Sequence, residues 1–292
     1  MSVDLKKIKE LRDRTNSGFL DCKNALEATN NDVEKAIDWL KEKGILKAAK
    51  KAGRIAADGI VKEFVKDNVA IMFELNCETD FVAKNEMFIE LADKITNALL
   101  KEKFESAEDL KDLKIDGLTI EEHCNELTAK IGEKVAFRRA TRFEAKDGEV
   151  VAGYTHANNK VASILIAKGS NQEALRQLAM HVAALNPAHI FESCLPKGEL
   201  TMIHKKIDSD PKLLNKPEKI QNSIKAGMLR KEMVEKGVLV FQPFVMDESK
   251  TVAQFLEDSK LELIYSKRFE VGEGIEKNVV DFAAEVAEQM KQ

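Results

Sequence analysis

The stretch from Val69 to Leu99 reads VAIMFELNCETDFVAKNEMFIELADKITNAL. It combines a predicted strand, a loop and a predicted helix, and this combination decides the fold class. In its first nine residues Phe73, Leu75 and Cys77 alternate with polar residues, which predicts a strand with one buried face and one wet face. From Phe88 onward apolar residues recur at helical spacing, which predicts an amphipathic helix. A strand that runs directly into such a helix favours an α+β fold.

Between this strand and this helix lies a loop, residues 76–85, that places one large aromatic beside one acid among small and polar residues. Phe81 in this position has two interpretations. It is an exposed anchor for a partner protein, or it is a core aromatic that closes the corner between strand and helix. The neighbouring Asp80 is likewise a candidate N-cap for a short turn. The residues of the loop alone leave these alternatives open.

The hairpin-plus-helix arrangement occurs twice. The predicted strands of the two hairpins are Ile60 to Val65 with Val69 to Cys77, and Val150 to His156 with Val161 to Lys168. Aligning the hairpins at Val69 and Val161 gives an offset of 92 positions, whereas aligning the helices at Phe88 and Leu175 gives 87. The first copy therefore has five extra residues between strand and helix. Because the second copy lacks them, the scaffold does not need them, which favours a functional loop.

Residues 1–53 predict three short helices, a unit too small to bury much surface and more typical of an adaptor than of an enzyme. The first covers Leu5 to Arg14 and the second Phe19 to Ala28. The third is expected to begin at Asn31 as N-cap and to stop at Gly44.

Further elements follow each copy of the repeat. A polar helical stretch is expected over roughly 106–132, with Thr119 and Glu122 as a capping box, and a strand near Val135 to Ala145. All five prolines lie between residues 187 and 243, and they bracket two helical runs that predict a projecting antiparallel hairpin. A last helix is expected from Val279 to Met290.

Composition excludes several classes of protein. A formal charge of −4 and a pI near 5.9 argue against a dedicated nucleic-acid binder. No apolar run is long enough to span a membrane and the N-terminus lacks a secretory signal, so a cytoplasmic protein is expected. Four cysteines without a CxxC pair favour reduced thiols over a disulfide or zinc framework.

Motifs for catalysis and for direct nucleotide binding are missing from the sequence. It contains no GxxxxGK[ST] phosphate loop, no GxSxG and no defensible catalytic triad, so no cofactor, metal or covalent chemistry is expected. An interaction protein is the favoured class. The alternatives are an RNA-associated protein, which would use Arg138, Arg139 and Arg142 with the helical arm, and an enzyme that no motif announces.

Many ordered blocks of the sequence carry a family resemblance. These are LRDRT (11–15), KAAKKAG (47–53), AADG (56–59), TDFVAK (79–84), IGE (131–133), MHVAA (180–184), QPFV (242–245) and FEVGEGIEK (269–277). Together they show that the chain resembles bacterial elongation factor Ts from end to end.

The resemblance implies a particular domain plan within the α+β class. A ubiquitin-associated-like (UBA-like) three-helix domain would cover residues 1–53. A core N-subdomain of the dimerisation type would cover 54–145. A core C-subdomain would cover 146–274, with a coiled-coil hairpin inserted at about 192–237. A C-terminal helical module would cover 275–292.

The resemblance also implies the activity. Members of the family are guanine nucleotide exchange factors for elongation factor Tu, without covalent chemistry. They bind Tu·GDP and promote release of GDP by disturbing the magnesium site, after which GTP binds. The expected partner is therefore elongation factor Tu, with no membrane and no specific nucleic acid. A homodimer within the complex stays open.

Site residues follow from the resemblance by position. The family motif Thr79, Asp80, Phe81 and Val82 reaches into the GTPase domain of Tu, where the Asp-Phe pair disturbs the helix and loop that help to hold magnesium. Contact roles with Tu are implied for Phe19, Leu20 and His181. The family commonly has methionines at the positions of Phe19 and Leu20, so altered packing is expected there.

Overall fold

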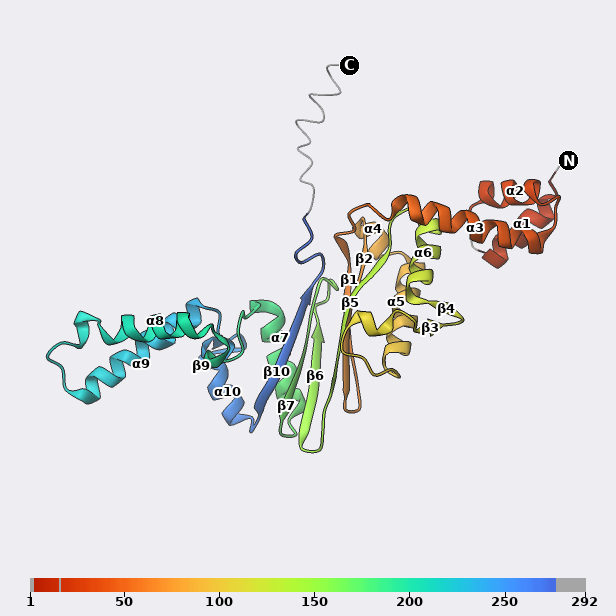
Figure 1. Cartoon of the computed structure of the whole chain (residues 1–292). Coiled ribbons are helices and arrows are strands. Elements are labelled where there is room, and N and C mark those ends of the chain that lie inside the picture. The colour runs from red at the N-terminus through yellow and green to blue at the C-terminus, as the bar shows by residue number, and fades with distance from the viewer. Residues whose placement is uncertain (1–2, 16, 277–292) are drawn as a thin grey trace, which may run out of the picture. The chain divides into compact units, whose positions relative to one another are not determined.

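The computed structural model describes residues 3–15 and 17–276, and the chain falls into two compact units. The first unit takes its residues from 1–60, 73–140 and 270 onward, and the second from 61–72 and 141–269. Figure 1 labels the elements along the chain, and each unit is described in turn. Within the described ranges no helix is long and apolar enough to cross a membrane.

The first unit begins with three helices, α1 (Leu5–Thr15), α2 (Phe19–Ala28) and α3 (Val33–Lys51). They enclose a small core to which Leu11, Cys22 and Leu26 contribute. The expected N-cap, Asn31, is wrong: its φ of 63° is left-handed, and the Asp32 carboxylate accepts the Lys35 N–H at 3.1 Å instead.

Gly44 does not end α3, which continues to Lys51. A β-carbon built on Gly44 would lie 3.3 Å from Cβ of Ala129, which shows that α3 packs closely here against a second helix, α6 (Ile120–Ile131). A glycine inside a helix costs about 1 kcal/mol relative to alanine, and this close approach offsets part of that cost. The close packing explains why the expected stop signal falls in mid-helix.

The first copy of the repeat consists of β1 (Asp58–Lys66), β2 (Val69–Cys77), α5 (Glu86–Leu99) and β5 (Ala136–Glu144), with sheet order β1-β2-β5. The wet face predicted for β2 is wrong: Glu74 and Asn76 are buried. β2 is the middle strand of this sheet. The Glu74 carboxylate forms ion pairs with Arg138 and Arg139 of β5, so it is buried together with the charges that stabilise it.

Short elements fill the interval between α5 and α6. They are η1 (Ala107–Leu110), β3 (Lys114–Ile115) and β4 (Leu118–Thr119). The capping box of Thr119 and Glu122 is confirmed, but the helix begins only at Ile120. The helix expected from about residue 106 fails to form there because β3 and β4 pair instead, through Lys114 with Thr119 and Ile115 with Leu118.

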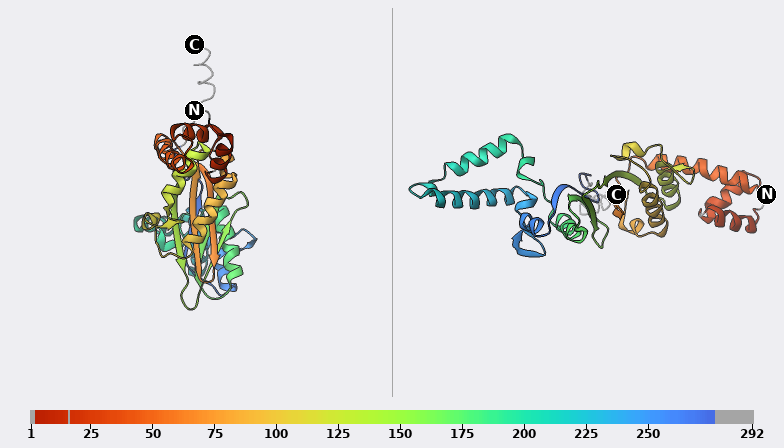
Figure 2. Two further views of the ribbon diagram at one scale, coloured as in Figure 1. Left: turned by 90° about the vertical axis from the view of Figure 1, so that its right-hand side faces the viewer. Right: turned by 90° about the horizontal axis from the view of Figure 1, so that it is seen from below.

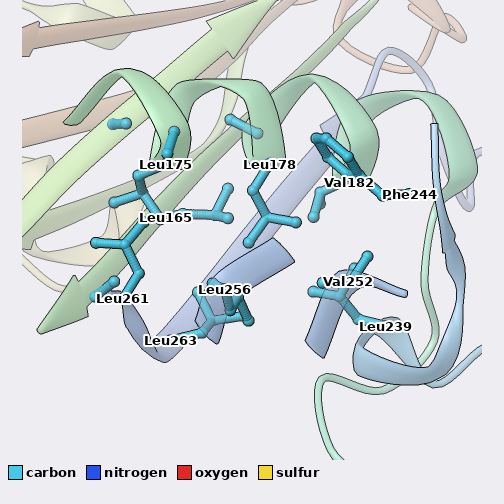
Figure 3. Packing of buried hydrophobic residues seen from close by; sticks show 14 residues of the cluster. Leu165, Leu175, Leu178, Val182, Leu239, Phe244, Val252, Leu256, Leu261 and Leu263 are labelled. Atoms are coloured by element: carbon cyan, nitrogen blue, oxygen red, sulfur yellow. The ribbon is translucent and has the colours of Figure 1, made fainter. Parts of the chain in front are cut away.

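The second copy consists of β6 (Glu149–Thr155), β7 (Val161–Lys168), α7 (Gln172–Leu185) and β10 (Glu262–Glu270), with sheet order β10-β7-β6. Residues of β6 and β7 pair in register, for example Val151 with Ile166. α7 lies along these strands and buries Leu175, Leu178 and Val182 in an apolar cluster of the second unit (Figure 3). No sequence pattern predicted β10, because only two of its nine residues are buried.

A helical hairpin follows α7 in the second unit, and it can be traced in Figure 2. It is made by α8 (Lys197–Asp208) and α9 (Glu218–Glu235), close to the two predicted helical runs. Leu195, Ile203, Ile207, Met233 and Val238 form its apolar seam. The connecting 3-10 turns are η2 (Glu192–Cys194), η3 (Pro211–Leu213) and η4 (Leu239–Phe241).

The chain then returns to the core of the second unit through β8 (Pro243–Phe244), β9 (Asp247–Thr251) and α10 (Val252–Asp258). Phe244, Val252 and Leu256 join the cluster under α7 (Figure 3). The QPFV block, one of those that carry the family resemblance, thus packs into the core of the second unit. The expected helix Val279 to Met290 lies outside the described residues, and the four-part domain division stays a prediction.

Candidate functional site

The loop between β2 and α5 contains a single helical turn, α4 (Asp80–Ala83). Thr79 is its N-cap, in extended conformation, so the alternative of Asp80 as cap is wrong. The side chain of Phe81 is 81% exposed, whereas Val82 and Ala83 retain only 6% and 7% of their surface. The turn is therefore held down by its second half and presents the aromatic outward. Phe81 does not close the corner of the core.

The acid beside the aromatic is balanced within the same turn. The Lys84 ammonium lies 2.7 Å from Oδ2 of Asp80, and this hydrogen bond raises the pKa of Lys84 above its ordinary value. Both side chains are largely exposed, so the pair adds little to stability. The next residue, Asn85, accepts the Met87 N–H at 3.0 Å and starts α5. The turn thus presents one aromatic beside one screened carboxylate.

The base of the turn is joined to the residues that follow α6. Oε2 of Glu133 accepts the Thr79 N–H at 3.0 Å, and the Thr79 hydroxyl lies 3.0 Å from both carboxylate oxygens. In the opposite direction the Lys134 N–H donates to Oε1 of Glu78 at 2.6 Å. Arg54 pairs with Glu78 at 3.3 Å. Two reciprocal links therefore fix the entry into α4.

A buried carboxylate, Glu74, lies on the strand that leads to the turn. Oε1 and Oε2 lie 3.1 Å and 2.5 Å from nitrogens of Arg138 and Arg139, and Oε1 also accepts the Gly272 N–H at 2.8 Å. Burial by itself raises the pKa of Glu74, but hydrogen bonds from Gly272, Asn76 and Arg139 outweigh it and leave the pKa below its usual value. Glu74 is therefore a charged centre that holds residues 270–273 on β2 and β5.

These ion pairs also bear on the RNA-binding alternative. Arg138 and Arg139 are directed to Glu74, and Arg139 further contacts the Glu273 carboxylate at 3.1 Å. Arg142 lies 2.5 Å from Glu144 and is mostly buried. The three arginines that the alternative would use for phosphate are thus engaged with acids of their own chain.

The predicted contact residues of the N-terminal helices lie on the surface. Phe19 and Leu20, at the start of α2, are 50% and 65% exposed. The neighbouring Asp21 forms an ion pair of 2.8 Å with Lys47, which sets the start of α2 beside the second half of α3. Leu46 of α3 is exposed as well. The two helices therefore present apolar side chains to solvent next to an ion pair.

His181 differs from the other predicted contact residues because it is fully buried in the second unit. Its Nε2 lies 3.0 Å from Oε1 of Gln242, and its Nδ1 accepts the Val245 N–H at 3.2 Å. Burial lowers the pKa of the imidazole, which keeps Nδ1 free to accept. The ring also stacks on Phe244. The side chain thus supports the QPFV segment and is not itself on the surface.

A cavity of about 510 Å³ opens beside this segment within the second unit. Its walls combine apolar side chains, among them Met180, Val245 and Met246, with the polar His156 and Arg268. Arg268 donates to the Ala183 carbonyl at 3.0 Å, which fixes its side chain against α7. Sequence reasoning missed the cavity, although two of the quoted blocks, MHVAA and QPFV, contribute to its wall.

Glu133 was also missed as a site residue. In the sequence Glu133 appears only within the IGE block of the family resemblance, and no functional role was assigned to that block. No group of three or more histidine, cysteine, aspartate or glutamate side chains in the described ranges is arranged to hold a metal ion. All four cysteines lie in these ranges, and no disulfide joins them.

Comparison with known proteins agrees with the sequence blocks. The family model described as Elongation factor TS matches residues 78–273. An elongation factor Ts of Metamycoplasma arthritidis is 68% identical over 292 residues and covers 100% of both chains. That of Mycoplasmopsis pulmonis is 50% identical over 97% of both chains, and that of Acholeplasma laidlawii 42% over 99%. The chain therefore belongs to the elongation factor Ts family, the translation elongation factors of protein biosynthesis.

Proposed function

We propose that the chain is a guanine nucleotide exchange factor for elongation factor Tu, which binds Tu·GDP, promotes release of GDP and so allows GTP to bind. The observation that carries this proposal is the exposure of Phe81 on a turn whose neighbours Val82 and Ala83 are buried. Because these buried neighbours fix the backbone of the turn, the segment that carries the aromatic has little conformational freedom to lose on binding. It is suited to enter a pocket of a partner.

Phe81 supplies the binding energy and Asp80 the charge. Burying a phenylalanine in a partner's pocket contributes roughly 1.5–3 kcal/mol, enough to shift a local equilibrium by one to two orders of magnitude. The Asp80 carboxylate, which is paired with Lys84 in the free chain, supplies polar contacts and local negative charge at the same place. Inserted together next to the bound nucleotide, they disturb the helix and loop that help to hold magnesium in Tu.

The exchange needs no covalent step. The factor and the magnesium-bound nucleotide each bind Tu, and each weakens the affinity of Tu for the other by the same factor. The factor therefore speeds release without selecting between GDP and GTP, and the excess of GTP in the cytoplasm sets the direction. This mechanism accounts for a protein that has neither a phosphate loop nor a catalytic triad.

Two further surfaces complete the proposed contact with Tu. Phe19 and Leu20 grip the GTPase domain through the exposed start of α2. The cavity beside Val245 and Met246 receives side chains of another domain of Tu. His181 contributes indirectly, because its bond to the Val245 N–H holds that wall in place.

The test is the rate at which Tu releases a fluorescent GDP analogue. Phe81→Ala is expected to fold normally, because the side chain makes little contact within its own chain, and to lower the rate of release about 30-fold at a fixed factor concentration. Phe64→Ala is the matched control, since Phe64 is also an exposed phenylalanine on the surface of the chain. Its rate should stay within twofold of that of the unmodified protein.

An unchanged rate for Phe81→Ala, with undiminished binding to Tu, would remove Phe81 from the mechanism. If Phe81→Ala and Phe64→Ala lower the release rate equally, exposed apolar surface in general is responsible. That result would also remove Phe81 as a specific site residue.

A further inference from the structure

We infer that Glu133 is a positioning residue of the exchange turn, the name used here for α4 (Asp80–Ala83). Its carboxylate completes the N-terminal cap of α4 and thereby fixes the direction of Phe81. The inference rests on the proposed exchange function, and it assigns a task to a residue 54 positions away from the turn in sequence. The carboxylate accepts both the N–H and the hydroxyl of Thr79 at 3.0 Å.

Other caps in this chain show what α4 lacks. At η1, α6 and α10 the cap residue is followed three positions later by Asp109, Glu122 or Gln254, whose side chain accepts the N–H of the cap. In α4 the same position is Val82, which is buried and has no acceptor. Val82 cannot be replaced by an acid without losing the apolar contact that holds the turn down. Glu133 supplies the missing acceptor from elsewhere in the fold.

The distances indicate that Glu133 is the stronger tie on Thr79. Within α4 the Thr79 hydroxyl accepts the Val82 N–H at 3.5 Å, which is long for a hydrogen bond. The contacts to Glu133 are 3.0 Å and involve an ionised acceptor, and such bonds are roughly twice as strong as neutral ones. A four-residue turn cannot sustain itself by helix propagation. Its geometry depends on the cap and on two buried side chains.

Glu133 is itself firmly held. Gly132 ends α6 in the left-handed conformation, with φ of 89°, and its carbonyl accepts from the Lys51 ammonium. The Lys134 ammonium donates to the carbonyls of Ala52 and Arg54 at 2.6 Å and 3.0 Å. The residues on either side of Glu133 are thereby tied to the last residue of α3 and to the segment that follows it. A carboxylate on such a support can define the position of another segment.

Loss of this carboxylate is expected to leave the fold intact and to loosen the turn. Phe81 would then sample more orientations, and a displacement of about 1 Å at a working group can cost up to about 100-fold in rate. We expect Glu133→Ala to lower the limiting rate of GDP-analogue release from Tu, at saturating factor, about tenfold. Affinity for nucleotide-free Tu should fall less than threefold, because most of the contact surface is unaffected.

The test is a cycle of four full-length proteins: unmodified, Glu133→Ala, Phe81→Ala and the double variant. If Glu133 acts through Phe81, Glu133→Ala has no further effect on the rate once Phe81 is gone. Glu122→Ala is the matched control, since Glu122 also accepts a threonine N–H, at 2.7 Å, at the other end of α6. Its rate should equal that of the unmodified protein.

The outcomes separate this inference from the proposed function. If Glu133→Ala lowers the release rate tenfold both when Phe81 is present and in the Phe81→Ala variant, the effect is a general structural one and the inference is overturned. The same tenfold loss in Glu122→Ala would overturn it as well. A normal rate for Glu133→Ala beside a slow Phe81→Ala would overturn it too, while the exchange function stands. A normal rate for Phe81→Ala would instead overturn the proposed site.

A second variant covers the case in which Glu133→Ala unfolds at the assay temperature. Glu133→Gln keeps one oxygen that can accept the Thr79 N–H but removes the charge. Its limiting rate should lie between those of Glu133→Ala and the unmodified protein, with an unchanged thermal midpoint. A release rate for Glu133→Gln as low as that of Glu133→Ala, or as high as that of the unmodified protein, would contradict the capping role.

Discussion

The two copies of the repeat differ most at the connection between strand and helix. Eight residues separate β2 from α5, and three separate β7 from α7, although both helices are 14 residues long. Both helices also begin with an asparagine cap, Asn85 or Asn171. The extra five residues therefore add the turn α4 without altering the start of the helix. The copies share a scaffold, and one of them presents an aromatic on it.

The interiors of the two copies differ as well. Glu74 on β2 occupies the position of Ile166 on β7 when the hairpins are aligned at Val69 and Val161. In the second copy the strands and α7 enclose an apolar cluster (Figure 3). In the first copy a buried carboxylate joins β2, β5 and residues 270–273. The copy that contains the turn α4 is also the one in which an ion pair joins segments that are distant in the sequence.

The largest expected effect comes from making the first connection like the second. Replacing residues 78–84 by the Gly-Ser of residues 169–170 retains Asn85 as the cap of α5 and removes α4. The rate of GDP-analogue release should fall on the order of 100-fold, as when a hot spot is lost. The loss of buried Val82 and Ala83 costs roughly 1–3 kcal/mol of stability. Circular dichroism with thermal unfolding checks the fold in parallel, and substantial residual exchange would show that the turn is dispensable.

A second, smaller effect is expected from Glu74→Ala, which leaves two arginines without their carboxylate. Breaking a buried pair from one side typically costs 3–5 kcal/mol, but Arg138 and Arg139 stay partly exposed, so we expect about 2 kcal/mol. Chemical denaturation at pH 7 measures this, with Glu262→Ala as control, because its pair with Lys168 is exposed. A loss below about 0.5 kcal/mol would contradict the role of Glu74 as a structural centre.

The same residue predicts a pH dependence. The pKa of Glu74 in the folded protein lies below its usual value, so the unfolded chain binds the proton more readily. The stabilisation is complete above the usual carboxyl pKa and is lost as the pH falls through the folded pKa. The free energy of unfolding of Glu74→Gln should therefore fall less than that of the unmodified protein between pH 6 and pH 3.

Glu63, on β1, is expected to make the stability depend on pH in the opposite direction. This is the smallest of the predicted effects. Burial raises the pKa of Glu63 to about 7, against the opposing influence of Arg176 and a hydrogen bond with Thr155. The folded state then retains a proton that the unfolded chain releases, so stability falls as the pH rises from about 4.5 to about 7. Glu63→Gln should be about 1 kcal/mol more stable than the unmodified protein at pH 8, after allowance for partial exposure, and close to it at pH 5. Equal stability at pH 8 would show that the carboxylate is solvated.

Local signals predicted much of this fold. Helical spacing located α2 and α5, and comparison of the repeats located the five-residue insertion. The capping box of Thr119 and Glu122 was predicted correctly, although the helix that it starts was expected to begin near residue 106. The exposure of Phe81 was not decided by its neighbours in sequence, since a buried aromatic fits the same pattern. It follows from Val82 and Ala83, which turn inward and leave Phe81 outside.

The remaining features depend on residues far apart in the chain. Alternation along β2 assigned Glu74 to a wet face, because nothing local announces the arginines of β5 or the Gly272 N–H, 198 residues away. Glu133 was invisible for the same reason: its partner Thr79 is 54 residues away. Gly44 was misread as a stop, since its close neighbour Ala129 belongs to another helix.

The contact between Glu74 and Gly272 has a consequence for biosynthesis. The second unit is interposed in the sequence, so residues 270–273 are translated after it, whereas Glu74 is translated well before it. Chains emerging from the ribosome tend to fold their early parts first, but the first unit cannot form the hydrogen bond from the Gly272 N–H to Glu74 until Gly272 has been translated. A truncated chain that stops before residue 270 would retain the turn α4 in a first unit that is incomplete.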